Sequence, residues 1–100
     1  QVRVITIGDE EPLINYAKEA VRELQQNEVR VSTDFSTDNI KGKIADAEKS
    51  KVHTMLVIGG RDLEAGNISV RLHGKGPQGS KPKAEVIANI VQAIKERRSN

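Results

Sequence analysis

Apolar and polar residues follow one another along this chain in patterns that predict a sheet with helices around it. Residues 55–58 are four consecutive apolar residues, and Gly59 and Gly60 end the run. A short apolar run stopped by glycines is typical of a strand that is buried on both faces. Such a strand needs cover above and below, so we expect residues 55–58 at the centre of a covered sheet.

The residues before this strand predict two strands and a helix. Residues 2–7 are rich in β-branched side chains and end at Gly8, which indicates a first strand. Acidic residues and Pro12 suit the start of a helix, which we expect to end near Asn27. Residues 29–35 alternate between apolar and polar, which indicates a half-exposed strand near an edge of the sheet. The apolar stripe of the helix is Leu13, Ala17, Ala20, Val21 and Leu24.

A second helix is expected after residue 35, with Ser36, Thr37 or Asp38 as its cap. Gly42 lies inside this helix, where it either permits a close approach or is simply tolerated. Lysines along the helix form either a solvated face or a surface that faces phosphate groups. The apolar stripe is Ile40, Ile44 and Ala47, and the lysines are Lys41, Lys43, Lys49 and Lys51.

The last third of the chain predicts one more strand and one more helix. Residues 61–67 are interpreted as a turn-rich link, and residues 68–72 alternate as expected for an antiparallel partner of the buried strand. Residues 74–81 are interpreted as a mobile basic loop without the spacing of a P-loop. Pro82 then opens a helix. Its apolar stripe is Ile87, Ile90 or Val91, and Ile94.

The order of elements predicts an α/β fold of three layers, α/β/α. Right-handed crossovers place the first three strands in parallel, and the hairpin adds an antiparallel fourth. We expect a mixed, mostly parallel sheet of strand order 2-1-3-4. Residues 1–100 are expected to form a single domain. Because the chain opens at Gln1 directly into a strand, we interpret it as a domain excised from a longer protein.

Composition narrows the possible functions. Apolar residues make up 36% and aromatic residues 2% of the chain, so the core must be aliphatic and base stacking on aromatic rings is nearly excluded. A net charge of +2 permits an RNA partner without requiring one. The chain has no cysteine, which excludes disulfides and thiolate zinc sites and favours an intracellular protein. We expect no membrane association.

Few residues suggest catalysis or metal binding. His53 and His73 lack a second histidine at a metal-ligand spacing, and no nucleophile motif is present. A doubly wound sheet would place a small-molecule site beyond Gly8 and the glycine pair at 59–60. Asp62 and Arg71 are more informative, because a carboxylate can accept from guanine while a guanidinium grips a base or phosphate. The alternative is a mutual salt bridge between these two residues.

Three stretches resemble the C-terminal anticodon-binding domain of class II aminoacyl-tRNA synthetases. They are residues 34–44, residues 55–62, and Ile68-Ser69-Val70-Arg71. The greatest similarity is to threonyl-tRNA synthetases, and the prolyl, glycyl and histidyl enzymes share the domain. The resemblance covers nearly the whole chain and implies a three-layer mixed sheet that reads the anticodon.

The resemblance also assigns residues. The anticodon-contacting acid of the family falls on Asp62, shortened from Glu, and the strand arginine falls on Arg71. Thr37 stands where many members have Asn, and Ala45 stands where they have Arg. His53-Thr54 replaces Pro-Tyr. The resemblance implies anticodon contacts at Asp62, Arg71, Thr37 and Lys43, with phosphate contacts at Lys41, Lys75 and Arg61.

The implied function is recognition of a threonine tRNA by a non-catalytic domain of a cytoplasmic threonine–tRNA ligase. The resemblance implies no metal or cofactor in this domain, with ATP and zinc in the catalytic domain of the parent enzyme. That enzyme is expected to be a homodimer. The alternatives are another class II synthetase and an accessory protein that reuses the fold for protein contacts. A third alternative is a flavodoxin-like domain that binds a small molecule.

Overall fold

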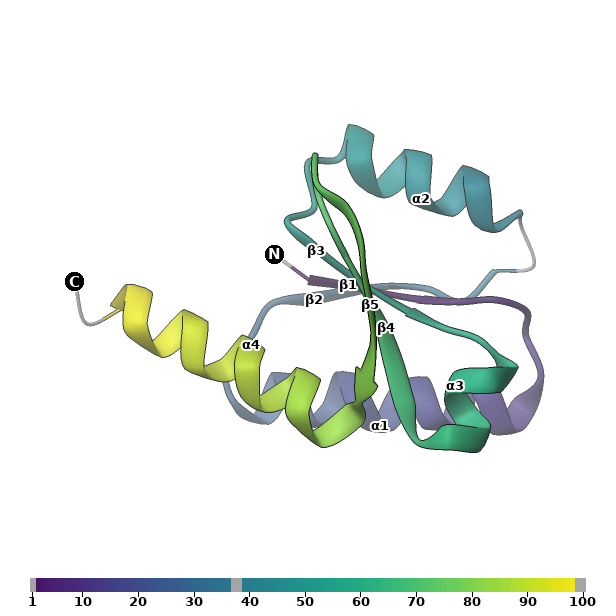
Figure 1. The fold of residues 1–100 in the computed structure, drawn as a ribbon, viewed down its shortest axis with the longest axis horizontal. Coiled ribbons are helices and arrows are strands. Elements are labelled where there is room, and N and C mark those ends of the chain that lie inside the picture. The colour runs from purple at the N-terminus through teal and green to yellow at the C-terminus, as the bar shows by residue number, and fades with distance from the viewer. Residues whose placement is uncertain (1, 37–38, 99–100) are drawn as a thin grey trace.

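A computed structural model describes residues 2–36 and 39–98. In this part of the chain a mixed sheet with strand order β2-β1-β3-β4-β5 carries helices on both faces (Figure 1). The elements are β1 (Val2–Thr6), α1 (Glu11–Gln26), β2 (Val31–Asp34), α2 (Ile40–Lys49), β3 (Thr54–Ile58), α3 (Gly60–Ala65), β4 (Asn67–Leu72), β5 (Gly76–Pro82) and α4 (Lys83–Arg98).

The central strand of the sheet is β3, as the apolar run predicts. All five of its residues are buried. β1 pairs in parallel with β2 and with β3, and β4 runs antiparallel to β3. The predicted order 2-1-3-4 and the three-layer class are therefore confirmed, with one further strand, β5, beyond β4.

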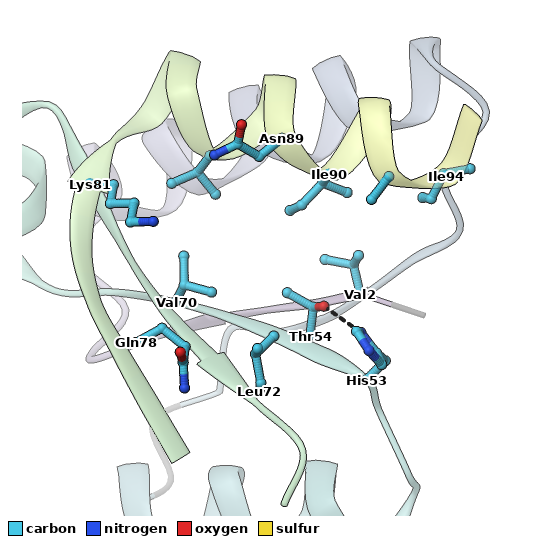
Figure 2. A pocket seen from close by; sticks show the side chains of 12 residues that line it. Val2, His53, Thr54, Val70, Leu72, Gln78, Lys81, Asn89, Ile90 and Ile94 are labelled. Atoms are coloured by element: carbon cyan, nitrogen blue, oxygen red, sulfur yellow. Dashed lines mark hydrogen bonds between the residues drawn. The ribbon is translucent and has the colours of Figure 1, made fainter. Parts of the chain in front are cut away.

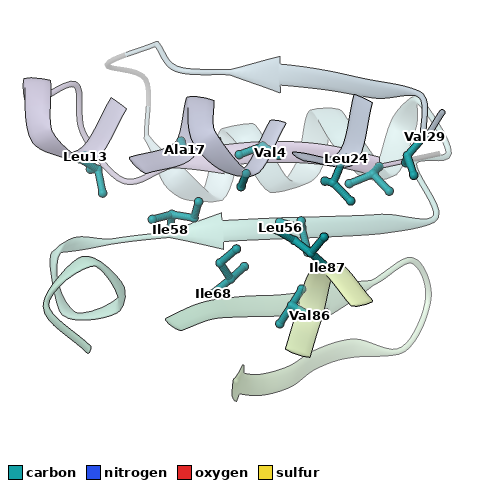
Figure 3. Packing of buried hydrophobic residues seen from close by; sticks show 12 residues of the cluster. Val4, Leu13, Ala17, Leu24, Val29, Leu56, Ile58, Ile68, Val86 and Ile87 are labelled. Carbon is teal, nitrogen blue, oxygen red and sulfur yellow. The ribbon is translucent and has the colours of Figure 1, made fainter. Parts of the chain in front are cut away.

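Two hydrophobic clusters cover the two faces of the sheet. On one face α1, α3 and α4 pack against β1, β3 and β4 around Leu56 and Ile58 (Figures 1 and 3). On the other face α2 packs alone, with Ala47 against Ile5, Met55 and Val57. The smaller cluster contains no residue of β4 or β5, so α2 covers only the middle of its face.

The predicted link at residues 61–67 is wrong, because this stretch contains the short helix α3. Gly59 precedes the helix, and its N–H donates to Asp62 Oδ2 at 3.0 Å. Gly66 ends the helix in the left-handed conformation, with φ of 72°. With six residues the helix is too short to show an apolar periodicity. A side chain on Gly59 would lie 3.2 Å from Ile7 Cδ1, so this glycine permits a close approach.

The predicted mobile loop at residues 74–81 is also wrong, because most of it forms β5. This strand pairs antiparallel with β4, and the register shifts between Val70 and Arg71. β5 is an edge strand, where proline is tolerated because the ladder needs no donor on its outer side. Its glycines and prolines therefore resemble a loop in sequence and form a strand only because β4 supplies a partner.

The cap of α2 is Asn39, whose Oδ1 accepts from the Lys41 N–H at 2.8 Å. The prediction of Ser36 is therefore wrong, and Thr37 and Asp38 lie outside the described residues. A Cβ at Gly42 would meet no atom within 4 Å, which supports the interpretation of a tolerated glycine.

Candidate nucleic-acid interface

Several of the expected site residues lie at one end of the sheet. β1, β2 and β3 all end there, and α2 and α3 begin there. In open α/β sheets this is the end at which ligands bind. It holds Asp62 and the exposed residues Lys41 and Arg61. Lys75 lies in the turn between β4 and β5, at the opposite end of the sheet (Figure 1), and Thr37 lies outside the described residues.

Asp62 is buried, with 9% of its surface exposed, and it joins three elements. Its carboxylate accepts from the Gly59 N–H, from Ser69 Oγ at 3.1 Å and from Ser80 Oγ at 3.0 Å. Ser69 Oγ also lies 3.4 Å from Oδ2, so the three donors make contacts at all of the about four acceptor positions of the carboxylate. Asp62 is therefore first an anchor that ties α3 to β4 and β5.

Arg71 lies on β4, opposite Met55 of β3, so it shares a face of the sheet with α2. Ser69 is two residues away and projects from the same face. No hydrogen bond or ion pair to the Arg71 side chain is found among residues 2–36 and 39–98, and its Nε is buried without a partner. The predicted alternative of an Asp62–Arg71 salt bridge is therefore wrong. The guanidinium is not engaged by the fold.

Lys43 is not on the exposed face of α2. Only 2% of the residue is exposed. Its ammonium group donates to the carbonyl oxygen of Thr6 at 2.7 Å and to that of Ser36, and it lies 3.5 Å from that of Asp34. Both interpretations are therefore wrong for Lys43, which is part neither of a solvated face nor of a phosphate-facing surface with Lys41. Lys43 instead donates to carbonyl groups at the ends of β1 and β2. Its contact with the anticodon stays a prediction, and the buried conformation of the side chain does not favour it.

The carboxylate of Asp34 is held beside this buried lysine. Burial raises the pKa of Asp34, but hydrogen bonds from Ser36 and the nearby charges of Lys43 and Arg3 outweigh it, so the pKa is lowered overall. The Oδ1 atom accepts from Ser36 Oγ at 2.7 Å and lies 4.0 Å from Lys43 Nζ. The folded state therefore favours the charged carboxylate.

Asp34→Asn should reduce the dependence of the free energy of unfolding on pH in the acidic range. Because the folded pKa is lowered, the stabilisation is complete above the ordinary value of about 3.9 and is lost as pH falls through the lower folded value. Thermal melts between about pH 5 and pH 2 measure this. The exposed Glu64→Gln is the control and should keep the native slope. An unchanged slope in Asp34→Asn would contradict the assigned charge interaction.

The serine anchors of Asp62 were not identified from the sequence. Ser69 lies on the polar face of an alternating strand, two residues before Arg71, and this spacing is a usable signal. Ser80 gave no such sequence signal, because β5 was not recognised as a strand. No group of three or more potential metal ligands occurs among the described residues. None of the described helices is long and apolar enough to cross a membrane.

Comparisons with known proteins identify the family of this chain. A model of the anticodon binding domain family matches residues 1–93. The threonine–tRNA ligase of a Sulfurihydrogenibium species is 38% identical over 100 residues, which is the whole chain and 15% of that protein. The ligase of Syntrophomonas wolfei is 37% identical over 97% of this chain and also 15% of that protein. The chain thus spans about one seventh of the length of these relatives.

Solved structures share the fold. The RNA binding domain of threonyl-tRNA synthetase from Cryptosporidium parvum superposes with a TM-score of 0.79 at 25% identity, over 89% of this chain and 22% of that one. Prolyl-tRNA synthetase from the same organism superposes with a TM-score of 0.84 at 24% identity, over 96% of this chain and 21% of that one, and supports the fold alone. The family model covers nearly the whole chain, so this protein belongs to the family of anticodon-binding domains.

Proposed function

We propose that this domain recognises the anticodon of a threonine tRNA as part of a threonine–tRNA ligase. The observation that carries this proposal is the 38% identity to such a ligase over all 100 residues of the chain. The ligation reaction, which needs ATP, belongs to parts of the enzyme outside this domain. For the parent enzyme we propose a cytoplasmic homodimer with zinc in its catalytic domain.

The RNA is proposed to lie across the exposed part of the α2 face, from the start of α3 to Arg71 near the end of β4. Arg71 offers a planar cation that none of the described side chains engages, which suits a base edge or a phosphate. Asp62 offers its Oδ2 atom, where the 3.4 Å contact from Ser69 is the longest of those present. Lys41 and Arg61 are exposed at the end of the sheet that holds Asp62, and they supply phosphate contacts. Lys75 lies in the turn just after Arg71, at the opposite end of the sheet from Lys41 and Arg61, and would contact another part of the tRNA.

Fluorescence anisotropy with a labelled threonine anticodon stem-loop tests the proposal. We expect weak binding whose affinity falls as salt rises, because the contacts are mainly to phosphates. Arg71→Ala should lose about 1 kcal/mol of binding free energy. Lys95→Ala is the control, since residue 95 lies on α4 and on the opposite face. Equal binding of a stem-loop with a scrambled anticodon would contradict anticodon recognition.

A proline anticodon stem-loop tests the second candidate, motivated by the fold shared with prolyl-tRNA synthetase. Preference for the proline stem-loop would place the domain in that enzyme. Absence of binding to any stem-loop would favour an accessory protein that uses the fold for protein contacts.

Ala45→Arg should strengthen binding by about 1 kcal/mol, the value of one hydrogen bond to a charged group. Residue 45 is exposed on α2, so an arginine there can extend into solvent without disturbing the core. The same anisotropy assay measures the gain. Ala65→Arg adds an equal charge at another exposed helical position and controls for non-specific attraction. Equal gains in both variants, or no gain at residue 45, would show that RNA does not pass this side of α2.

A further inference from the structure

A groove of about 300 Å³ lies on the other face of the sheet, away from α2 and from Arg71. Figure 2 shows its two walls, with α4 on one side and the strands on the other. The strand side includes Val70 and Leu72, and the helix side includes Ile90 and Ile94. Its volume is at the lower end of the range for pockets that bind small molecules.

The groove exists because α4 packs on the sheet only through its first half. Val86 and Ile87 are 3% and 8% exposed, and they close the core. Ile90 and Ile94, one and two turns later, are only partly buried, as are Val70 and Leu72. Figure 1 shows α4 continuing past the edge of the sheet. Aliphatic side chains therefore line a space that no described side chain fills.

The lining of this groove carries a single charged side chain, a lysine. Lys81 belongs to its lining, and Figure 2 shows the Lys81 side chain directed over Val70. Among the described residues no carboxylate pairs with Lys81, and the lining contains no acidic residue. His53 lies toward the other end of the groove, where its Nδ1 is 2.8 Å from Thr54 Oγ1. An apolar channel with an unpaired cation at its side is complementary to an amphipathic anion.

We propose that this groove binds a small amphipathic carboxylate. The hydrocarbon part lies between Ile90 and the pair Val70 and Leu72, and the carboxylate accepts from the ammonium group of Lys81. The limited volume and the single cation favour such a ligand over a second protein chain, which would need a larger surface. The proposal concerns the face opposite Arg71 and does not rest on anticodon recognition.

Octanoate is the probe, and octanol, with the same chain length and no charge, is its control. Titration of the isotope-labelled 100-residue chain, followed by NMR, should shift the signals of Val70, Leu72 and Ile90. We expect octanoate to bind about tenfold more tightly than octanol, because of the charged hydrogen bond. Lys81→Met should remove this advantage, and Lys75→Met, at the exposed turn, should keep it.

Ala93→Phe tests the apolar part, because residue 93 lines the groove and is exposed. A phenyl ring there should occupy the groove and abolish binding of both probes, while thermal melts confirm that the variant folds. Equal affinities for octanoate and octanol, or an unchanged octanoate affinity in Lys81→Met, would overturn the proposal. A dimer detected by sedimentation and disrupted by Ala93→Phe would overturn it too, since the groove would then be an interface between copies. RNA binding is measured separately and should be unaffected by octanoate.

Discussion

Replacing Lys43 with methionine is expected to lower the free energy of unfolding by about 3 kcal/mol. The buried ammonium group donates to the carbonyl oxygens of Thr6 and Ser36 and approaches that of Asp34. Methionine fills a similar volume without a donor, so these carbonyl groups lose their partner in a place that water reaches poorly. Relief of the cost of burying a charge offsets part of the loss. Urea unfolding followed by circular dichroism measures the difference.

Lys41→Met is the matched control, because Lys41 lies two residues away on the same helix and is exposed. Its free energy of unfolding should stay within about 0.5 kcal/mol of the native value. Equal stability of the two variants would contradict the role of Lys43 as an internal donor. If Lys43→Met, measured far below its melting temperature, loses RNA affinity while the Lys95→Ala control on the opposite face does not, the anticodon contact expected at Lys43 regains support.

Lys43 shows why the site was harder to predict than the fold. A lysine between other lysines on a helix is ordinarily solvated, but Lys43 stands three residues after Ile40 and four before Ala47, within the apolar stripe of α2. The direction of the Lys43 side chain is fixed by carbonyl groups at the ends of β1 and β2, which lie beneath the helix and accept from the ammonium group. Those carbonyl groups come from residues 9 and 37 positions away along the chain. The helical spacing indicates which face of α2 carries Lys43, but it cannot identify the carbonyl groups that accept from it.

The sheet was predictable as far as local patterns extend. Residues 55–58 carry an apolar run that only a central strand explains, and the strand order followed from that strand and the handedness of crossovers. β5 was missed because Gly76, Pro77 and Gly79 are typical of loops, and pairing with β4 overrides their propensity. α3 was missed because a helix of six residues is fixed by its ends, at Gly59 and Gly66, and not by periodicity.

The second large effect is expected at Asp62, where Asp62→Ala should lower the free energy of unfolding by about 3 kcal/mol. The substitution leaves the Gly59 N–H and the hydroxyl groups of Ser69 and Ser80 without their common acceptor. Ser80→Ala removes one of these three hydrogen bonds and should cost about 1 kcal/mol. Urea unfolding measures both variants, and a loss at Asp62 no larger than at Ser80 would contradict the anchoring role.

Asp62→Asn separates this anchoring role from recognition of a base. The amide oxygen can still accept from Gly59, and the serine hydroxyl groups can rotate to accept from the amide nitrogen, so the fold should lose only about 1 kcal/mol. A guanine N–H group that donates to the Asp62 carboxylate would instead lose its charged acceptor. We therefore expect Asp62→Asn to bind the threonine stem-loop about 1–3 kcal/mol more weakly, with reduced discrimination at the central guanine.

Anisotropy with stem-loops that differ only at the central base decides between the two roles, alongside thermal melts of the same protein samples. If Asp62→Asn lowers the melting temperature but keeps both affinity and discrimination, Asp62 serves the fold alone. The double variant with Arg71→Ala adds a second criterion. Its loss of affinity should be smaller than the sum of the single losses if both residues hold the same nucleotide, because either substitution alone already disturbs that contact. Additive losses would place the two side chains on separate nucleotides.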